Sequence, residues 1–156
     1  MNLEWLKTGM GPLKDILTWL SKEGKTNDIL KRQVLRELRN NLNIFHNAYL
    51  NEVAADVMID MLSNEAIKKA MEANFKFKKL KPGRIEPYHV KDDRNKKYIG
   101  WECDQLVDKI DEKIEELKNI KKMKGTVVNV KNNVSLMLSN LYYRMKLLAD
   151  FIKGPK

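Results

Sequence analysis

Residues 127–152 read VVNVKNNVSLMLSNLYYRMKLLADFI, and this stretch carries the most regular apolar pattern in the chain. Its apolar residues recur at intervals of three and four, which places them on one face of an α-helix. They are Val127, Val130, Val134, Met137, Leu141, Met145, Leu148 and Ile152. Because the same rhythm is typical of helices that pack along each other, we predict a long final helix that lies against another helix.

The preceding segment, from Trp101 to Gly125, predicts that second helix. Acidic residues concentrate in its first half and lysines in its second half, an order that complements the helix dipole. Gly125 is placed to end the helix. The apolar face consists of Cys103, Leu106, Val107, Ile110, Ile114, Leu117 and Ile120. Since only a short turn at Gly125 separates the two helices, they should pack antiparallel.

The first part of the chain also predicts helix. An apolar stripe from Leu3 to Leu20 is interrupted at residues 9–12, so we expect a short helix, a break and a second piece that ends near Gly24. Residues 27–62 then predict the longest helix of the chain. Beyond Tyr49 its apolar face moves by about 100°, which indicates a kink, a bulge or a change of packing partner.

The length of this predicted helix suggests self-association. An unbroken helix over residues 27–62 would be about 54 Å long. A compact chain of this size has a diameter of about 40 Å, so such a helix would extend beyond the rest of the bundle. We therefore expect a second copy of the chain to cover its surplus apolar face, in a homodimer or larger homo-oligomer.

Composition agrees with one helical domain over residues 1–156. Of the 156 residues, 43% are hydrophobic and 33% are charged, which suits a folded chain. The sequence has 7 glycines and 4 prolines, few enough for helix to dominate. We predict an all-α fold, an elongated antiparallel helical bundle of about four main helices. A basic excursion at about residues 73–100, irregular or hairpin-like, should interrupt the bundle.

Three features predict a cytoplasmic protein without a transmembrane segment. No apolar run approaches the ~20 residues that span a bilayer. The first twenty residues include Glu4 and Asp15 and lack the apolar core of a signal peptide. Cys103 is the single cysteine, so the chain cannot form an internal disulfide and shows no sign of an oxidising compartment.

The excess positive charge is concentrated in one region. The formal net charge is +9, and residues 68–97 contain eleven basic residues against four acidic ones. We call residues 73–100 the basic lobe. Its cations are interleaved with aromatic rings, which suits a phosphate-bearing single strand. The candidate polyanion-binding residues are Lys76, Lys78, Lys79, Lys81, Arg84, Lys91, Arg94, Lys96, Lys97, Phe75 and Phe77.

The basic lobe also has a structural interpretation. The acidic first half of the helix after Trp101 can neutralise its cations, and Phe75 and Phe77 can anchor it to the bundle. The alternation of apolar and basic residues at 75–78, followed by a turn at 81–84, predicts a short hairpin-like strand.

Two Arg–His pairs have a spacing that resembles the R-x4–6-H motif of HEPN ribonucleases. The pairs are Arg39 with His46 and Arg84 with His89. The resemblance implies a helical bundle whose Arg and His converge on RNA phosphate at a dimer interface, where Arg stabilises charge and His moves a proton. The chain departs from the motif at Ala48, where the family has an aromatic residue. The alternative interpretation is that His46 flanks the core and Arg39 is a solvated charge.

We therefore predict a non-enzymatic interaction or scaffold protein that forms a homo-oligomer. The first alternative is a nucleic-acid or polyanion-binding module that uses residues 76–97, and the second is a HEPN-like ribonuclease. We assign no catalytic residue, metal ligand or cofactor, because Glu86 and His89 form a single E-x-x-H spacing where a di-iron bundle needs two. Besides a second copy of the chain, the expected partners are nucleic acid or an acidic protein.

Overall fold

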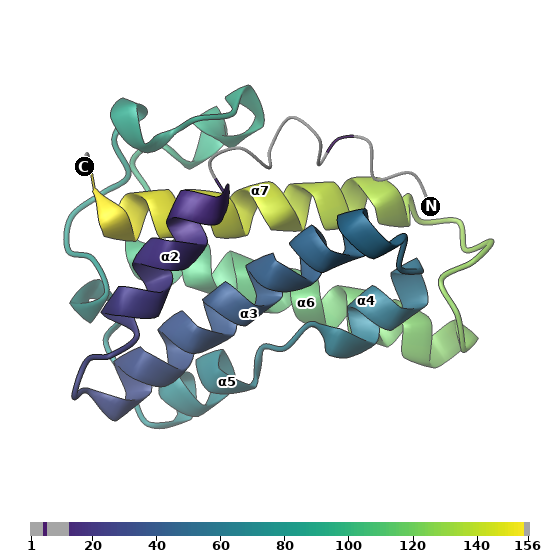
Figure 1. The fold of residues 1–156 in the computed structure, drawn as a ribbon, viewed down its shortest axis with the longest axis horizontal. Coiled ribbons are helices and arrows are strands. Elements are labelled where there is room, and N and C mark those ends of the chain that lie inside the picture. Colours follow the sequence, from purple (N-terminus) through teal and green to yellow (C-terminus); the bar gives the residue numbers. More distant parts are fainter. Residues whose placement is uncertain (1–4, 6–12, 155–156) are drawn as a thin grey trace.

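The computed structural model describes residue 5 and residues 13–154, which form a helical bundle without a β-strand (Figure 1). The four long helices of this part of the chain are α2 (Leu13–Glu23), α3 (Ile29–Asn51), α6 (Cys103–Lys124) and α7 (Val134–Lys153). The shorter elements are α4 (Ala55–Met61), α5 (Glu65–Glu72) and the 3-10 helices η1 (Phe77–Lys79), η2 (Pro87–His89) and η3 (Asp93–Tyr98). The prediction of an all-α bundle is confirmed.

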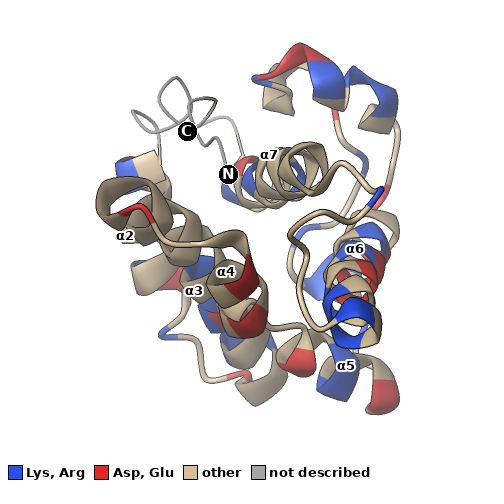
Figure 2. Ribbon diagram, turned by 90° about the vertical axis from the view of Figure 1, so that its right-hand side faces the viewer, with Lys and Arg blue, Asp and Glu red and all other residues tan. Residues whose placement is uncertain are grey.

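Helix α7 is the centre of the bundle. It contacts α2, α3 and α6 as well as η2 and η3 of the basic lobe, so its neighbours enclose it (Figure 2). As a result, every side chain from residue 141 to residue 149 is buried. A helix without a solvated face must satisfy its polar side chains inside the protein, and α7 carries both Arg144 and Lys146 in this stretch.

Helix α6 ends where its sequence predicts and begins at Cys103, two residues after Trp101, where the predicted segment starts. A capping box precedes it, in which the Glu102 N–H donates to Gln105 Oε1 at 2.8 Å. The helix ends at Gly125, whose φ of +76° is the left-handed conformation common at helix C-termini. Helices α6 and α7 contact each other and run antiparallel, as predicted (Figure 1).

Helix α7 starts later than its apolar pattern predicts. The Asn133 side chain caps it, with Oδ1 accepting the Leu136 N–H at 3.1 Å, and Asn129 has a left-handed φ of +65°. Asparagine side chains compete with helical backbone, and β-branched valines disfavour helix. The prediction that Val127 and Val130 are helical is therefore wrong, although the Val127 side chain is still buried.

The long helix predicted over residues 27–62 is two helices, α3 and α4. Helix α3 ends at Asn51, Glu52 adopts a left-handed φ of +50°, and α4 begins at Ala55. The change of apolar face after Tyr49 therefore marks a helix end and not a kink inside one helix. Because α3 alone is about 34 Å long, the overhang that motivated a homodimer does not exist.

The structure tests the N-terminal predictions in part. Helix α2 ends at Glu23, beside Gly24, as predicted. The short helix expected before residues 9–12 lies outside the described residues. No helix of the described part combines the length and the apolar character that crossing a bilayer requires.

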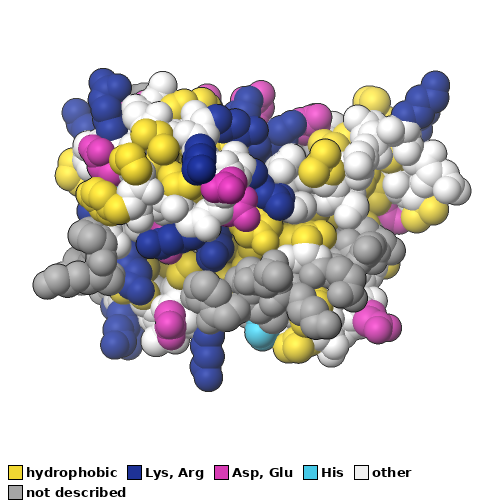
Figure 3. Space-filling model, turned by 90° about the horizontal axis from the view of Figure 1, so that it is seen from above, with side chains coloured by type: hydrophobic (Ala, Val, Ile, Leu, Met, Phe, Trp, Pro, Cys, Tyr) yellow, Lys and Arg dark blue, Asp and Glu magenta, His cyan; other side chains and the backbone are white. Residues whose placement is uncertain are grey.

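The basic lobe is irregular, as predicted, and consists largely of 3-10 turns. Helix η1 occupies the place where the alternation at residues 75–78 suggested a strand. Two backbone hydrogen bonds of 2.8 Å close the lobe, from the Ile85 N–H to Trp101 O and from the Gly100 N–H to Ile85 O. On the face seen in Figure 3, Lys and Arg side chains gather over the half of the molecule that carries the lobe.

A buried carboxylate on α3 holds the start of α5. Glu37, which is 8% exposed, accepts the N–H groups of Ala66 (2.7 Å) and Ile67 (3.2 Å) and the hydroxyl of Ser63 (2.9 Å). These donors include amides of the first turn of α5, which have no partner inside the helix. Burial raises the pKa of Glu37 above its ordinary value of 4.5, although the hydrogen bonds oppose the rise.

The raised pKa of Glu37 predicts a pH dependence of stability. The folded state holds this proton more tightly than the unfolded state, so the contribution is fully present below pH 4.5 and is lost as pH rises through the raised pKa. Urea unfolding of the wild type and of Glu37→Gln, which cannot titrate, should show the wild type losing stability relative to the variant as pH rises above 4.5. Glu72→Gln, at an exposed position of α5, controls for the loss of one carboxylate. A difference that is constant or grows with pH would contradict the prediction.

Candidate anion-binding site

A cavity of about 440 Å³ opens where η3, α6 and α7 meet. Three segments line it: η3 with the residues that follow it, two positions one turn apart on α6, and two positions one turn apart on α7. The lining residues are Lys97, Tyr98, Trp101, Lys109, Lys113, Asn140 and Arg144. Four of these side chains are cationic and none is acidic, so we call this cavity the cationic pocket.

Arg144 is the most unusual residue of the cationic pocket. Its side chain belongs to the enclosed stretch of α7 and is 4% exposed. Nε donates to the Tyr98 hydroxyl at 2.8 Å, and the guanidinium carbon lies 5.6 Å from the centre of the Tyr98 ring. Nη1 is buried and has no hydrogen-bond partner among the described residues. No carboxylate of the described chain lies within ion-pair distance, so the charge is buried without a counter-charge.

The lysines of the cationic pocket are also weakly neutralised. Lys113 pairs with Glu116 at 2.8 Å, but both side chains are partly exposed and a pair of this kind stabilises little. Lys97 lies 5.5 Å from the centre of the Tyr98 ring, and Lys109 forms no ion pair with any described carboxylate. The pocket therefore carries a net positive charge next to a low-dielectric interior.

Two aromatic rings form one wall of the pocket. Tyr98 is buried and is fixed by its contacts with Arg144 and with Trp101, whose ring meets it edge to face at 4.8 Å. Trp101 is only partly buried, so it is the ring that retains surface for a ligand. The arrangement places one accessible aromatic ring beside several cations.

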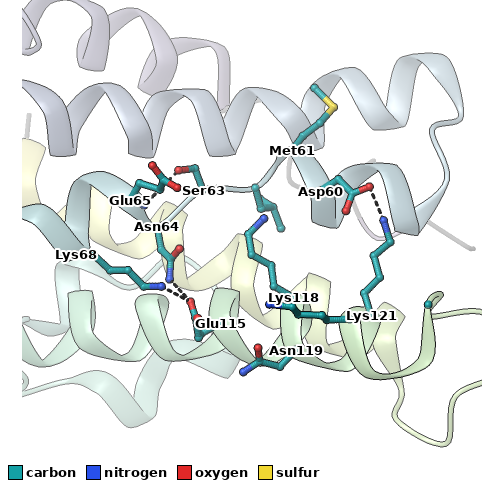
Figure 4. Close-up of a pocket in the computed structure, with 13 residues that line it drawn as sticks. Asp60, Met61, Ser63, Asn64, Glu65, Lys68, Glu115, Lys118, Asn119 and Lys121 are labelled. Atoms are coloured by element: carbon teal, nitrogen blue, oxygen red, sulfur yellow. Dashed lines mark hydrogen bonds and ion pairs between the residues drawn. The ribbon is translucent and has the colours of Figure 1, made fainter.

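A larger cavity, of about 760 Å³, lies between the α4–α5 connection and α6 (Figure 4). It also contains four lysines, three of which are already engaged: Lys68 pairs with Glu115 at 2.8 Å, Lys121 pairs with Asp60, and Lys118 donates to Ile59 O at 2.9 Å. These contacts join α4 and α5 to α6 and leave little charge for a ligand. We therefore prefer the smaller cationic pocket as the candidate site.

Of the eleven residues predicted to bind a polyanion, Lys97 alone lines the cationic pocket. Three other cations of the basic lobe have acidic partners nearby. These pairs are Arg84 with Glu102 (3.5 Å), Arg94 with Asp92 (3.0 Å) and Lys96 with Asp93 (3.1 Å). The lobe thus neutralises part of its own charge, while Lys76, Lys78 and Lys79 are exposed. Polyanion binding by the exposed lobe lysines stays a prediction.

The two phenylalanines of the predicted site face the core. Phe75 is 8% exposed and Phe77 is 6% exposed, and their rings meet edge to face at 5.3 Å. They anchor the basic lobe to the bundle, which agrees with the structural interpretation. Neither ring has a free face on which a base could stack.

The Arg–His pairs that resemble the HEPN motif do not converge within this chain. Arg39 donates to Ser21 at 3.2 Å, and His46 lies two turns further along α3. His89 is buried, accepts the Glu86 N–H at Nδ1 (2.9 Å) and meets Phe151 edge to face, while its pair member Arg84 is exposed. Burial lowers the pKa of His89, which favours the neutral imidazole. The ribonuclease hypothesis stays a prediction without support from this geometry.

The described part of the chain contains neither a candidate metal site nor a reactive thiol. No group of three or more His, Cys, Asp and Glu side chains there is placed to hold a metal ion. Burial raises the pKa of Cys103 to about 12, so its thiol is not a nucleophile near neutral pH.

Comparison with protein-family models, with curated protein sequences and with solved structures finds no match to this chain.

The uncompensated charge of Arg144 predicts that oxyanions stabilise the fold. Phosphate stabilises most proteins by being excluded from their surface, so a site-specific effect must be measured against a variant. Thermal unfolding in phosphate instead of chloride at equal ionic strength should raise the Tm of the wild type at least about 2 °C more than that of Arg144→Met. Lys78→Met, which removes an exposed lobe lysine, should behave as the wild type. Equal gains for the wild type and Arg144→Met would show that the pocket holds no anion.

Proposed function

We propose that this protein binds a phosphate-bearing ligand that also carries a flat ring, in the cationic pocket. The observation that supports the proposal is Arg144, a buried guanidinium without a carboxylate partner among the described residues. Burying an arginine charge is costly unless an opposite charge lies close to it. A bound oxyanion would supply that charge, and Lys97, Lys109 and Lys113 line the same cavity.

Five of the seven lining residues have a specific role in this proposal. The Tyr98 hydroxyl holds Nε of Arg144, so the guanidinium is oriented before a ligand arrives. Lys109 and Lys113 act as point charges toward phosphate oxygens, and Lys113 can exchange its surface pair with Glu116 for the ligand. The partly buried Trp101 ring stacks on a base, an interaction of about 1–3 kcal/mol.

The proposed function is binding without catalysis. The lining residues include no His, Asp, Glu, Cys or Ser, and the Tyr98 hydroxyl is already engaged by Arg144. The remaining side chains of the cavity that could transfer a proton are its lysines, which in our proposal act as charges toward phosphate. The proposal keeps the predicted binding of polyanions but moves its centre from the lysines of residues 76–81 to the pocket at Arg144.

The lysines of α6 provide a direct test of the proposal. Lys109→Gln together with Lys113→Gln should weaken binding of adenosine monophosphate about tenfold, because two charge-assisted contacts are lost. The matched control, Lys76→Gln together with Lys78→Gln, removes the same charge from exposed lobe positions and should bind as the wild type does. Isothermal titration calorimetry at low salt measures both. Equal weakening by the two pairs would point to diffuse attraction by net charge instead of a pocket.

Self-association is the second function that we propose, and it would use a different surface. Although α3 ends at Asn51, three large apolar side chains at its end and on α4 are exposed: Leu50 (59%), Val57 (48%) and Met61 (58%). Burial of these side chains against a second copy would be favourable in proportion to their apolar area. This surface supports the predicted interaction or scaffold protein now that the overhanging helix is excluded.

Light scattering tests self-association. The wild type should have the mass of a homodimer or larger homo-oligomer at about 50 µM protomer, and Val57→Lys with Met61→Lys should have the mass of a monomer. Val128→Lys, at a loop position that is 62% exposed, controls for adding a charge to an exposed apolar site. A wild-type monomer at this concentration would remove the proposal.

A further inference from the structure

We infer that the ligand of the cationic pocket is a single strand of nucleic acid that continues along α7, and not a free nucleotide. This inference rests on the proposed function. Its starting point is a second cavity, of about 510 Å³, which adjoins the cationic pocket because Asn140 lines both. The second cavity extends toward the start of α7, where Asn133, Ser135 and Leu136 contribute to its lining.

The two cavities follow one stripe of α7. Asn133, Leu136, Asn140 and Arg144 recur at intervals of three and four and therefore lie on one face of the helix. From Leu136 to Arg144 this stripe is about 12 Å long. Adjacent nucleotides are about 3.4 Å apart when stacked and further apart when their bases contact separate rings, so that length accommodates about two to three nucleotides, whereas a single nucleotide fills the first cavity alone.

The second cavity repeats the chemistry of the first. Among the described residues that line it, Arg94 is the one cation and none is acidic. The Arg94 guanidinium carbon lies 4.1 Å from the centre of the Tyr143 ring, and Nη1 donates to Ser139 Oγ at 2.6 Å. Although Arg94 pairs with Asp92 at 3.0 Å, both side chains are about one-third exposed, so a phosphate can compete for the guanidinium.

Apolar surface for a second base also lies in this cavity. Leu136 is 52% exposed, and the partly buried Trp5 ring lines the same cavity. Contacts with Phe45, Tyr142 and Tyr143 hold the Trp5 ring in place. Each of the two cavities thus combines at least one cation with an aromatic ring, as the repeating phosphate and base of a nucleic-acid strand require.

A duplex fits these cavities less well than a single strand. Its bases stack on one another and show only their edges, so neither Trp101 nor Trp5 could reach a base face. An acidic peptide would satisfy the cations but would leave the rings without partners. The arrangement therefore favours an unpaired strand of RNA or DNA.

Fluorescence anisotropy with labelled thymidine oligonucleotides of one, three, six and twelve nucleotides tests the inference at low salt. Affinity should rise at least about tenfold from one nucleotide to three and should exceed that of a twelve-base-pair duplex and of poly-glutamate. A salt series on the twelve-nucleotide probe should fit a linear decrease of log affinity with log salt. Oligoribouridine of the same lengths should behave in the same way, because no described contact selects the sugar.

Leu136→Glu is the decisive variant, since it places a negative charge in the second cavity at a half-exposed position. It should remove the gain from one nucleotide to three and leave binding of the mononucleotide unchanged. Val128→Glu, at an exposed apolar loop position, is its matched control and should keep the gain. Arg94→Gln should lower the salt slope by about 0.7.

The outcomes separate this inference from the proposed function. If the mononucleotide binds and added length brings no gain, the ligand is a free nucleotide and only the inference fails. The inference fails as well if the duplex or poly-glutamate binds as tightly as the single strand. It also fails if Leu136→Glu and Val128→Glu change the gain in affinity with length equally. If no phosphate-bearing probe binds, both proposals fail.

Discussion

The enclosure of α7 is the constraint on which the rest of the fold depends. Since α2, α3, α6 and the basic lobe each cover part of it, every side chain from residue 141 to residue 149 is buried. Most of these side chains are apolar or aromatic and contribute burial in proportion to their area. The two cations of the stretch, Arg144 and Lys146, gain no such stabilisation from burial. Lys146 acts on the nearby carboxylate of Asp150, whose pKa burial raises and Lys146 lowers, whereas Arg144 has only Tyr98.

Much of the fold could be predicted because its signals are local. Gly125 sets the end of α6 through its own backbone conformation, so the sequence alone was sufficient there, whereas the Glu102 capping box that precedes the helix was not recognised in the sequence. The end of α3 was harder, because neither glycine nor proline marks it and Glu52 adopts the left-handed conformation instead. The shift of the apolar face beyond Tyr49 was the one signal, and it indicated a discontinuity without deciding between a kink and a stop.

The candidate site was largely missed, because sequence reveals how many charges a segment has but not which of them are compensated. The basic lobe stands out by its lysines, yet Arg84, Arg94 and Lys96 have acidic partners nearby. Lys109 and Lys113 are one turn apart on α6 and were hidden among the acids of that helix, because only packing shows which residues share a cavity. The available signal for Arg144 was a single arginine within the apolar run of α7. Such a residue is an exception to the rule that charged side chains are rarely buried without a partner.

Charge compensation, and not cavity volume, distinguishes the candidate site from its larger neighbour. Two buried ionisable groups of this fold show the difference. Glu37 accepts three hydrogen bonds, and the rise of its pKa means that it can also reduce the cost of burial by taking up a proton. Arg144 has no such option, because a guanidinium remains protonated in proteins. An arginine that a fold encloses keeps its positive charge permanently, and the counter-charge must come from the chain or from a ligand. Among the described residues the chain does not supply it, so an anion bound at Arg144 would stabilise the folded state.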